Sequence, residues 1–276
     1  MNQTILITGC SSGLGQTTAL HFARQGWNVI ATMRRPADAA DFSEWPNVMV
    51  VRLDVEDAAS IEAAIAAGIE RFGRIDAVVN NAGFGLFGLF EATLPEKIAE
   101  QFAVNVFGAM NVMRAILPHF REHRSGTVVN VGSGAGVFGL PMLSLYCASK
   151  FALEGFSEAI SYELASQGIR VKMIEPGGVT STRFGERSGA EAAQNAGIAD
   201  YESFVEATAG LFARMRDERR GTEEEVAQTI YAAVTDGTDR LRYVATKDIL
   251  PIVQARRETS EEAFMAYMRT HYQPQC

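Results

Sequence analysis

Short apolar runs alternate along this chain with longer stretches in which apolar residues return at every third or fourth position. A short apolar run predicts a strand, and the longer periodic stretch predicts a helix with one buried face. Seven strands are therefore expected, at residues 5–7, 29–32, 48–53, 75–79, 127–131, 169–174 and 241–245. The expected helices cover residues 13–25, 58–72, 96–117, 145–167 and 223–235, with Gly26 as a left-handed cap after the first and Pro118 ending the third.

This alternation predicts an α/β fold, in which a doubly wound parallel sheet carries helices on both faces. The strands are apolar throughout rather than at every second position, which indicates burial on both sides. Residues 1–246 hold the pattern and are expected to form one domain. Residues 181–221 interrupt it with scattered glycines and no strand, which predicts a lid over a ligand site, and residues 247–276 are expected to form a helical tail.

Composition narrows the classes of function. The net charge of −8 at pH 7 argues against a nucleic-acid partner, because such a partner requires a basic face. No uncharged apolar stretch reaches the length of about 18 residues that a membrane span needs, so none is expected. Three cysteines are too few for a disulfide framework, and no leader precedes the first strand, so a cytoplasmic protein is expected.

His119 and His123 stand four residues apart and can share one helix face. Two histidines form an incomplete ligand set for zinc, and no glutamate completes the HExxH arrangement. No metal site is expected.

The first expected strand leads into a glycine-rich turn, TGCSSGLG at residues 8–15, and then into a helix. Such a turn lets the backbone approach a pyrophosphate closely, and the helix N-terminus offers unpaired N–H groups and a positive dipole end. The spacing is GxxxGxG rather than the GxGxxG of the better-known dinucleotide fingerprint, so its weight comes from its place in the first βα turn. The alternative is a tight turn that binds no ligand.

The end of the second expected strand bears on the choice between NAD(H) and NADP(H). An acidic residue there would bond the adenosine 2′-hydroxyl of NAD(H), whereas an arginine accommodates the 2′-phosphate of NADP(H). The chain reads ATMRR at residues 31–35, with no carboxylate. Arg34 can hold a phosphate through a bidentate fork, so NADP(H) is favoured over NAD(H). The alternative is that Arg34 and Arg35 form a solvated loop end.

Tyr146 and Lys150 stand four residues apart near the start of an expected helix, where such residues lie one above the other. The pKa of a free tyrosine is about 10, too high for efficient proton transfer at neutral pH, and a fixed cation beside the phenol is expected to lower it. The same YxxxK spacing occurs at Tyr243 and Lys247. That pair falls in an expected strand, where four residues span about 13 Å, so it is interpreted as sheet packing.

Other polar residues follow the expected strands at the edge where open α/β sheets bind their ligands. Ser133 comes just after the fifth strand, and its hydroxyl can polarise a carbonyl group. The sequence NNAG at residues 80–83 ends the fourth strand, and PGG at residues 176–178 follows the sixth. Asn105 lies between two valines inside an expected helix, as a site residue or as a buried amide with satisfied hydrogen bonds.

These motifs resemble those of the short-chain dehydrogenase/reductase family over residues 8–181, and the sheet pattern continues to about residue 246. The resemblance implies a single-domain Rossmann-type fold with seven strands in the order 3-2-1-4-5-6-7. It implies that Tyr146 transfers the proton, that Ser133 orients the carbonyl, that Lys150 binds the nicotinamide ribose and lowers the pKa of Tyr146, and that Asn105 supports a water relay. The implied cofactor site comprises Gly9, Ser11, Ser12, Gly13, Leu14, Gly15, Arg34, Asp54, Val55, Asn81, Ala82, Gly83, Tyr146, Lys150, Pro176, Gly177, Val179 and Ser181.

Within the family, GLP at residues 139–141 and YCASKFALEG at residues 146–155 are similar to the 17β-hydroxysteroid and retinol dehydrogenase branch, whose cofactor is often NADP(H). Two positions depart from the family pattern. Gly132 stands where a serine commonly precedes the catalytic one, and Ser181 stands where threonine is frequent, although a hydroxyl is retained. The resemblance implies that Asp54 contacts the adenine; taken alone, Asp54 could also be a helix N-cap.

Apolar residues gather near the expected site, with glycines between them that leave room for a ligand. They indicate a small hydrophobic carbonyl or alcohol as substrate, and only the branch resemblance suggests a steroid or retinoid. The alternative is that half of these residues belong to the core. The candidate substrate contacts are Phe84, Leu86, Val137, Leu140, Leu143 and Phe184.

Three functions compete. The favoured one is an NADP(H)-dependent oxidoreductase that interconverts a hydrophobic ketone or aldehyde and its alcohol by hydride transfer, with Tyr146 as acid and base. A non-catalytic nucleotide-binding regulatory protein on the same fold would not need an acid–base pair. An epimerase or dehydratase is disfavoured by the glycine spacing and by the short region after Pro176. The resemblance also implies a homodimer or homotetramer formed through the helices at residues 96–117 and 145–167.

Overall fold

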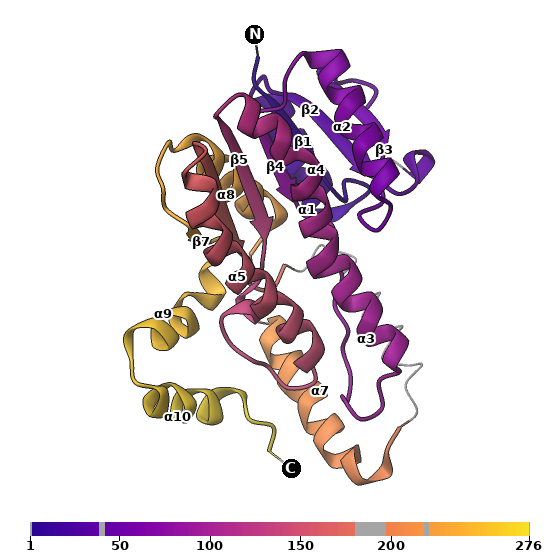
Figure 1. The fold of residues 1–276 in the computed structure, drawn as a ribbon. Helices are drawn as coiled ribbons and strands as arrows, with labels where there is room; N and C mark the ends of the chain where they lie inside the picture. Colours follow the sequence, from indigo (N-terminus) through magenta and orange to yellow (C-terminus); the bar gives the residue numbers. More distant parts are fainter. Residues whose placement is uncertain (1, 39–41, 180–196, 218–220, 276) are drawn as a thin grey trace.

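The computed structural model describes residues 2–38, 42–179, 197–217 and 221–275 (Figure 1). Seven parallel strands form one sheet in the order β3-β2-β1-β4-β5-β6-β7, which confirms the predicted fold class and strand order. The strands are β1 (Thr4–Ile7), β2 (Asn28–Met33), β3 (Val48–Arg52), β4 (Ala77–Asn80), β5 (Gly126–Val131), β6 (Ile169–Glu175) and β7 (Arg242–Val244).

Helices cover both faces of the sheet, which explains why most strand residues are apolar on either side. Neighbouring residues of β1 point to opposite faces, so that Ile5 and Ile7 join one core cluster and Leu6 joins the other. Gly26 follows the first helix with φ +82°, as predicted for a left-handed cap. One face is covered by α1 (Gly13–Arg24) and α8 (Glu223–Thr235), and the other by α2 (Ala58–Phe72), α4 (Ala109–Glu122) and α5 (Ser144–Ala165).

The single long helix predicted over residues 96–117 is wrong in two respects. A π-helical segment, η2 (Ala103–Gly108), separates α3 (Pro95–Phe102) from α4 and changes the direction of the side chains that follow it. Helix α4 then continues past Pro118 instead of ending there. Pro118 and Arg114 are both exposed, so the carbonyl that loses its helical N–H partner lies on the solvent side.

The region predicted as a lid falls partly outside the described residues, which omit residues 180–196 and 218–220. The part between these gaps forms η4 (Ala199–Tyr201) and α7 (Glu202–Asp217). The ring of Phe212 on α7 packs edge-on against Phe87, with 5.3 Å between the ring centroids. A parallel bridge joins Val179 to Gly221 and so brings the two ends of the region together.

The residues after β7 are helical and extend from that edge of the sheet (Figure 1). They form η5 (Lys247–Ile249), α9 (Leu250–Glu258) and α10 (Glu261–Tyr272), and Ser260 caps the last helix by accepting a hydrogen bond from the Ala263 N–H. Their apolar side chains pack on the loop that follows β5. The buried members of this cluster are Val137, Phe138, Ile249, Ile252, Val253, Phe264 and Met268.

Two short 3-10 turns complete the described elements, η1 (Pro36–Asp38) after β2 and η3 (Gly134–Gly136) after β5. Within the described part of the chain, no helix combines the length and apolar character that crossing a membrane requires.

Candidate active site

The glycine turn after β1 is built for close backbone contact. Gly9 and Gly13 have φ values of +74° and +61°, which glycine adopts without strain. A β-carbon added to Gly15 would lie 2.3 Å from the carbonyl oxygen of Gly9 and 2.5 Å from the amide nitrogen of Asn81. The spacing of the glycines therefore sets the shape of this turn.

The N-terminus of α1 is open to an anion. Ser12 occupies the N-cap position but makes no capping hydrogen bond with its side chain, and the first turn contains no acidic residue. The leading N–H groups and the positive end of the helix dipole therefore face the turn without a carboxylate to neutralise them. Ser11 is exposed at the same point, and Leu14 is half-buried. These features fit a pyrophosphate.

The loop after β4 is bound to the glycine turn. The hydroxyl of Thr8 accepts hydrogen bonds of 3.0 Å from the N–H groups of both Asn81 and Ala82, and the side-chain amide of Asn81 donates to the Thr8 carbonyl at 2.8 Å. Gly83 is exposed beside them. The amide of Asn80 instead donates to Asn130 at 2.8 Å inside the sheet. Asn81, Ala82 and Gly83 thus border the turn, whereas Asn80 belongs to the core.

Arg34 follows β2 directly and is exposed at the carboxyl edge of the sheet. Val55, after β3, is buried. The carboxylate of the neighbouring Asp54 accepts a hydrogen bond from the Glu56 N–H at 3.2 Å. Asp57 caps α2 through the Ser60 N–H, so the alternative interpretation of Asp54 as the helix N-cap is wrong.

Tyr146, Lys150 and Ser133 meet at the exit of β5. The Ser133 side chain lies beside the Tyr146 phenol, close enough to lower its pKa as a hydrogen-bonding neighbour. Lys150 lies one helical turn below Tyr146, with Nζ 5.8 Å from the centre of the tyrosine ring. Its ammonium donates a 2.8 Å hydrogen bond to the carbonyl of Val131, the last residue of β5. Tyr146 is 8% exposed and Lys150 is 7% exposed, so both ionisable groups are buried.

Burial controls the ionisation of both groups. It raises the pKa of Tyr146 to about 12, against a smaller lowering by the hydrogen bond with Ser133. It lowers the pKa of Lys150 to about 8, against an opposing effect of the Glu154 carboxylate. Loss of solvent around the phenol therefore sets the direction of the Tyr146 pKa, while the Lys150 ammonium is directed at Val131.

Asn105 lies in the π-helical segment with its amide satisfied. Its Nδ2 donates to the Phe84 carbonyl at 2.8 Å and to the Ser149 hydroxyl at 3.2 Å, and its Oδ1 accepts from the Phe84 N–H at 3.0 Å. The Ser149 hydroxyl in turn donates to the Tyr146 carbonyl at 2.8 Å. The side chain of Gln101 secures the next residues, accepting from the Leu86 N–H and donating to the Phe84 carbonyl, each at 2.8 Å. Asn105 thus connects the segment after β4 to the helix that carries Tyr146.

The segment after β6 is held by residues that follow β7. Thr246 accepts a 2.8 Å hydrogen bond from the Gly177 N–H through its hydroxyl, and Asp248 accepts one of 2.8 Å from the Gly178 N–H through its carboxylate. Pro176 is buried, and Val179 begins the bridge to Gly221. Sequence reasoning did not identify Thr246 and Asp248. Their position just after a strand at the ligand-binding edge was the available signal.

The predicted substrate residues separate into groups. Leu143 packs against Tyr146 in a small cluster with Ala135 and Cys147. Phe84 and Leu86 are buried in the segment secured by Asn105 and Gln101. Val137 and Leu140 instead pack in the cluster formed with the C-terminal helices. Phe184 and Ser181 lie outside the described residues.

The histidine pair lies away from this edge, and Tyr243 is paired with Lys172 rather than with Lys247. The rings of His119 and His123 stand 4.5 Å apart, and His119 Nε2 accepts a hydrogen bond from the Ile75 N–H. No group of three or more His, Cys, Asp or Glu side chains suited to a metal occurs in the described ranges. The hydroxyl of Tyr243 lies 3.0 Å from Nζ of Lys172 and donates to Asp236.

Comparisons with known proteins agree with this geometry. The model of the family described as short chain dehydrogenase matches residues 3–193. Human 17-beta-hydroxysteroid dehydrogenase type 1 is 36% identical over 266 residues, which cover 91% of this chain and 80% of that protein. A short-chain dehydrogenase structure from Streptomyces avermitilis has a TM-score of 0.82 at 31% identity, covering 98% of this chain and 95% of the other.

A short-chain dehydrogenase/reductase from Burkholderia phymatum, solved in complex with NAD, has a TM-score of 0.79 at 24% identity, covering 100% of this chain and 97% of the other. At that identity the likeness shows the fold alone. The family match, the relatives and the seven-stranded topology lead to one conclusion. The chain belongs to the short-chain dehydrogenase/reductase family, in its 17β-hydroxysteroid dehydrogenase-like branch, and is an oxidoreductase that acts on CH–OH groups with a nicotinamide cofactor.

Proposed function

We propose that this protein is an NADP(H)-dependent reductase of hydrophobic ketones or aldehydes, with Tyr146 as the proton donor. The observation that carries the proposal is the meeting of Tyr146, Ser133 and Lys150 at the sheet edge where the glycine turn opens. A purely regulatory nucleotide-binding protein has no need of a phenol that is buried, protonated and bonded to a serine hydroxyl.

The residues of this edge fit a dinucleotide. The uncapped start of α1 would bind the pyrophosphate, with Gly9, Gly13 and Gly15 keeping side chains out of its way. Asp54 and Val55 would lie at the adenine, and the segments 81–83 and 176–179 would border the nicotinamide. When bound, the cofactor supplies the hydride. Arg34 would bind a 2′-phosphate, which no carboxylate at the end of β2 repels. The preference for NADP(H) rests on Arg34, because family membership alone does not decide it.

Each side chain has a separate task in the proposed reaction. The Ser133 hydroxyl orients the substrate carbonyl, and the Tyr146 hydroxyl gives its proton to the carbonyl oxygen as the alcohol forms. The Lys150 ammonium stabilises negative charge at the phenol oxygen after the proton has left, and binds the ribose hydroxyls. Asn105 fixes the backbone around Phe84, and we assign it the supporting place in the catalytic set.

Ionisation favours the direction of reduction. With a pKa of about 12, the Tyr146 phenol holds its proton at neutral pH, which is the state that a proton donor requires. The pKa of Lys150, at about 8, leaves most of its ammonium charged at pH 7. Both groups are therefore in the state needed for reduction before substrate arrives.

The wall of the site is apolar, which suits a hydrophobic substrate. Leu143 packs beside Tyr146, and Phe84 and Leu86 are buried in the segment that Asn105 and Gln101 secure. An apolar wall contributes binding in proportion to the area that it covers and discriminates weakly between substrates. We therefore propose a class of substrate rather than a single compound.

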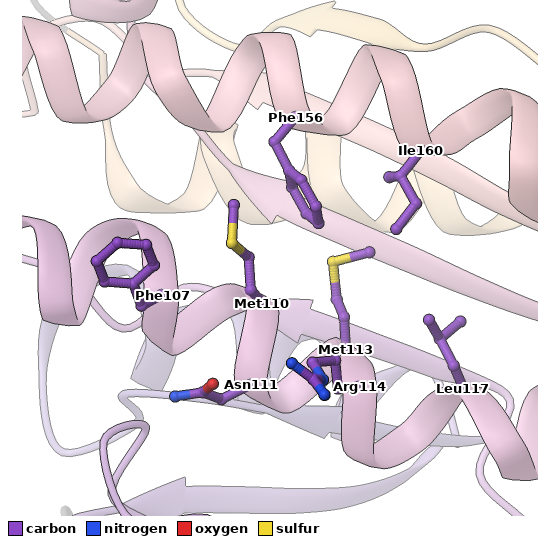
Figure 2. A pocket seen from close by; sticks show the side chains of 8 residues that line it. All are labelled: Phe107, Met110, Asn111, Met113, Arg114, Leu117, Phe156 and Ile160. Atoms are coloured by element: carbon purple, nitrogen blue, oxygen red, sulfur yellow. The ribbon is translucent and has the colours of Figure 1, made fainter.

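We further propose that two copies pair through α4 and α5. A groove of about 330 Å³ lies between these helices. Figure 2 shows apolar side chains directed into it from both helices. Phe107 at one end of the groove is 56% exposed, and Tyr162 further along α5 is 76% exposed. Light scattering of the purified protein tests the pairing, and a monomer at micromolar concentration would contradict it. The groove is lined by Phe107, Met110, Asn111, Met113, Arg114, Leu117, Phe156 and Ile160.

The proposed activity is tested by following NADPH oxidation with a panel of aldehydes, ketosteroids, retinal and 3-oxoacyl thioesters, each also assayed with NADH. Turnover of at least one hydrophobic carbonyl, faster with NADPH at equal concentration, is expected. Binding of NADPH without turnover of any member would favour the regulatory alternative.

A further inference from the structure

A buried carboxyl group lies one helical turn beyond Lys150. Glu154 is 6% exposed and shares the inner face of α5 with Lys150, four residues earlier. Its Oε2 accepts a 3.0 Å hydrogen bond from Nε of Arg242, while its Oε1 is buried and has no hydrogen-bond partner in the described part of the chain. An unsatisfied oxygen on a buried carboxyl is costly and calls for a physical reason.

The glycines on both sides of Ser133 bring this carboxyl close to the site. A β-carbon added to Gly132 would lie 3.1 Å from Oε1 of Glu154, and one added to Gly136 would lie 3.0 Å from its Cγ. Lys150 donates to the carbonyl of Val131, the residue just before Gly132. The ammonium of Lys150 and the carboxyl of Glu154 therefore contact adjacent residues of the same short loop, immediately before Ser133.

Four further charged groups face Glu154, from α5, β6, β7 and α9. Arg242 on β7 bonds both Glu154 and the more exposed Glu158, and its Nε lies 3.8 Å from Oε1 of Glu175. Glu175, on β6, is fully buried. Arg257, on α9, donates to the same Glu175 oxygen. Two buried carboxyls are thus held by two arginines, one of which comes from the C-terminal helices.

We propose that Glu154 is a positioning residue for Lys150, and that its negative charge, maintained by Arg242 and Arg257 against the neighbouring charge of Glu175, keeps the Lys150 ammonium charged beside Tyr146. This assignment deepens the proposed function and rests on it. Glu154 itself touches neither substrate nor cofactor. Through Arg257 it also gives the C-terminal helices an electrostatic connection to the proton-transfer pair.

The charges determine the direction in which Glu154 changes the pKa of Lys150. Burial lowers the pKa of Lys150 to about 8, and the Glu154 carboxylate acts against that lowering. Burial, and then the charge of Glu175, raise the pKa of Glu154 to about 7, while Arg242 and Arg257 lower it. Above pH 7 Glu154 is charged and supports the ammonium. Removing this charge would let Lys150 lose its proton at a lower pH, so activity would fall earlier as the pH rises.

The test uses the small number of lysines in the chain. These are Lys97, Lys150, Lys172 and Lys247, so side-chain NMR of lysine labelled with carbon-13 at Cε can follow Lys150 directly, assigned with Lys150→Arg. Glu154→Gln keeps the size of the side chain and an acceptor for Arg242 but removes the charge. Glu158→Gln is the matched control, since it removes a charge bonded to the same arginine one turn further from Lys150.

In Glu154→Gln, the pKa of Lys150 should fall by roughly half a unit to one unit, and the alkaline limb of the pH profile of kcat/KM should move by the same amount. Glu158→Gln should leave both unchanged. Equal pKa values of Lys150 in wild type and Glu154→Gln, or equal shifts in both variants, would overturn the proposal. The NMR titration requires no turnover, so it decides the role of Glu154 even if no carbonyl substrate is found.

A second variant covers the case in which Glu154→Gln fails to fold. Arg257 is half-exposed on α9, and Arg257→Gln leaves the core intact while taking one positive charge from Glu175. The pKa of Glu154 should then rise, and the pKa of Lys150 should fall in the same direction as in Glu154→Gln but by less. An unchanged Lys150 titration in Arg257→Gln would contradict the connection to the C-terminal helices.

Discussion

Two buried tyrosine–lysine pairs lie in this molecule, and they differ in how fully the lysine is satisfied. Lys172, on β6, is 1% exposed and donates to Asp236, to the Thr238 and Arg240 carbonyls and to the Tyr243 hydroxyl, at distances between 2.6 and 3.2 Å. Lys150 is almost as buried, but among the described residues its hydrogen-bond partner is the Val131 carbonyl alone.

The number of hydrogen-bond acceptors around each lysine distinguishes a structural lysine from one that can bind a ligand. An ammonium group has three protons to donate, and leaving them unmatched in a buried place is unfavourable. Lys172 is surrounded by acceptors that hold it in one state, as a structural ion pair requires. Lys150 retains capacity to bind hydroxyl groups of a ligand. The Tyr243–Lys247 spacing in the sequence therefore does not mark a functional pair. Tyr243 has a structural role, and its lysine partner is Lys172.

The largest expected contrast comes from removing each phenol oxygen in turn. Tyr146→Phe should reduce turnover by about a thousand-fold or more while NADPH still binds, because the variant lacks its general acid. Tyr243→Phe should keep turnover and instead lower the free energy of unfolding by about 1–2 kcal/mol, since Lys172 and Asp236 each lose a hydrogen bond. Steady-state rates and urea unfolding measure both. Similar turnover in the two variants would remove the distinction between the pairs.

Replacing each lysine by methionine should give opposite effects on stability. Lys172→Met should lower the free energy of unfolding by about 2–4 kcal/mol, because Asp236 and two carbonyls lose their donor. Lys150→Met should leave stability at pH 7 unchanged or higher, because burial already disfavours the Lys150 charge, yet it should reduce turnover at least about a hundred-fold. A loss of stability in Lys150→Met as large as in Lys172→Met would show that Lys150 is also a packing residue.

A smaller effect is expected at the far end of the proposed cofactor site. Arg34→Ala should weaken NADPH binding by about 10- to 100-fold and change NADH binding little, because a charge-assisted bond to the 2′-phosphate is lost. Arg35→Ala is the neighbouring control and should have the weaker effect. Fluorescence titration with both cofactors gives the ratio of the dissociation constants for NADPH and NADH. Equal weakening of NADPH and NADH in Arg34→Ala would assign Arg34 to general structure.

Most of the fold could be predicted from the sequence because buried parallel strands leave a strong local signal. Apart from the helix over residues 96–117, every predicted element lies within two residues of its observed bounds. The prediction of that helix failed because apolar periodicity does not reveal a π-helical turn. Hydrogen bonds between Asn105 and Phe84 stabilise the turn here. The prediction that Pro118 ends the helix failed because an exposed helix position tolerates the loss of one backbone hydrogen bond.

The site was predictable as a set of residue types but not as an electrostatic environment. The meeting of Ser133, Tyr146 and Lys150 follows from the topology, since all three come from the exit of β5 and the helix after it. The net pKa of Tyr146 could not be predicted, because it also depends on burial, which raises it and which spacing in the sequence does not report. Glu154 and Asp248 escaped notice because their partners lie more than sixty residues away along the chain.

We propose that Lys150 binds the cofactor, whereas Lys172 stabilises the fold. Carbon-13 NMR of the four lysines, recorded before and after addition of saturating NADPH, distinguishes these two roles. The Lys150 signal should move and its pKa should rise, as ribose hydroxyls satisfy the ammonium, while the Lys172 signal stays in place. Movement of Lys172 with an unchanged Lys150, or no change in either signal at saturation, would contradict the account.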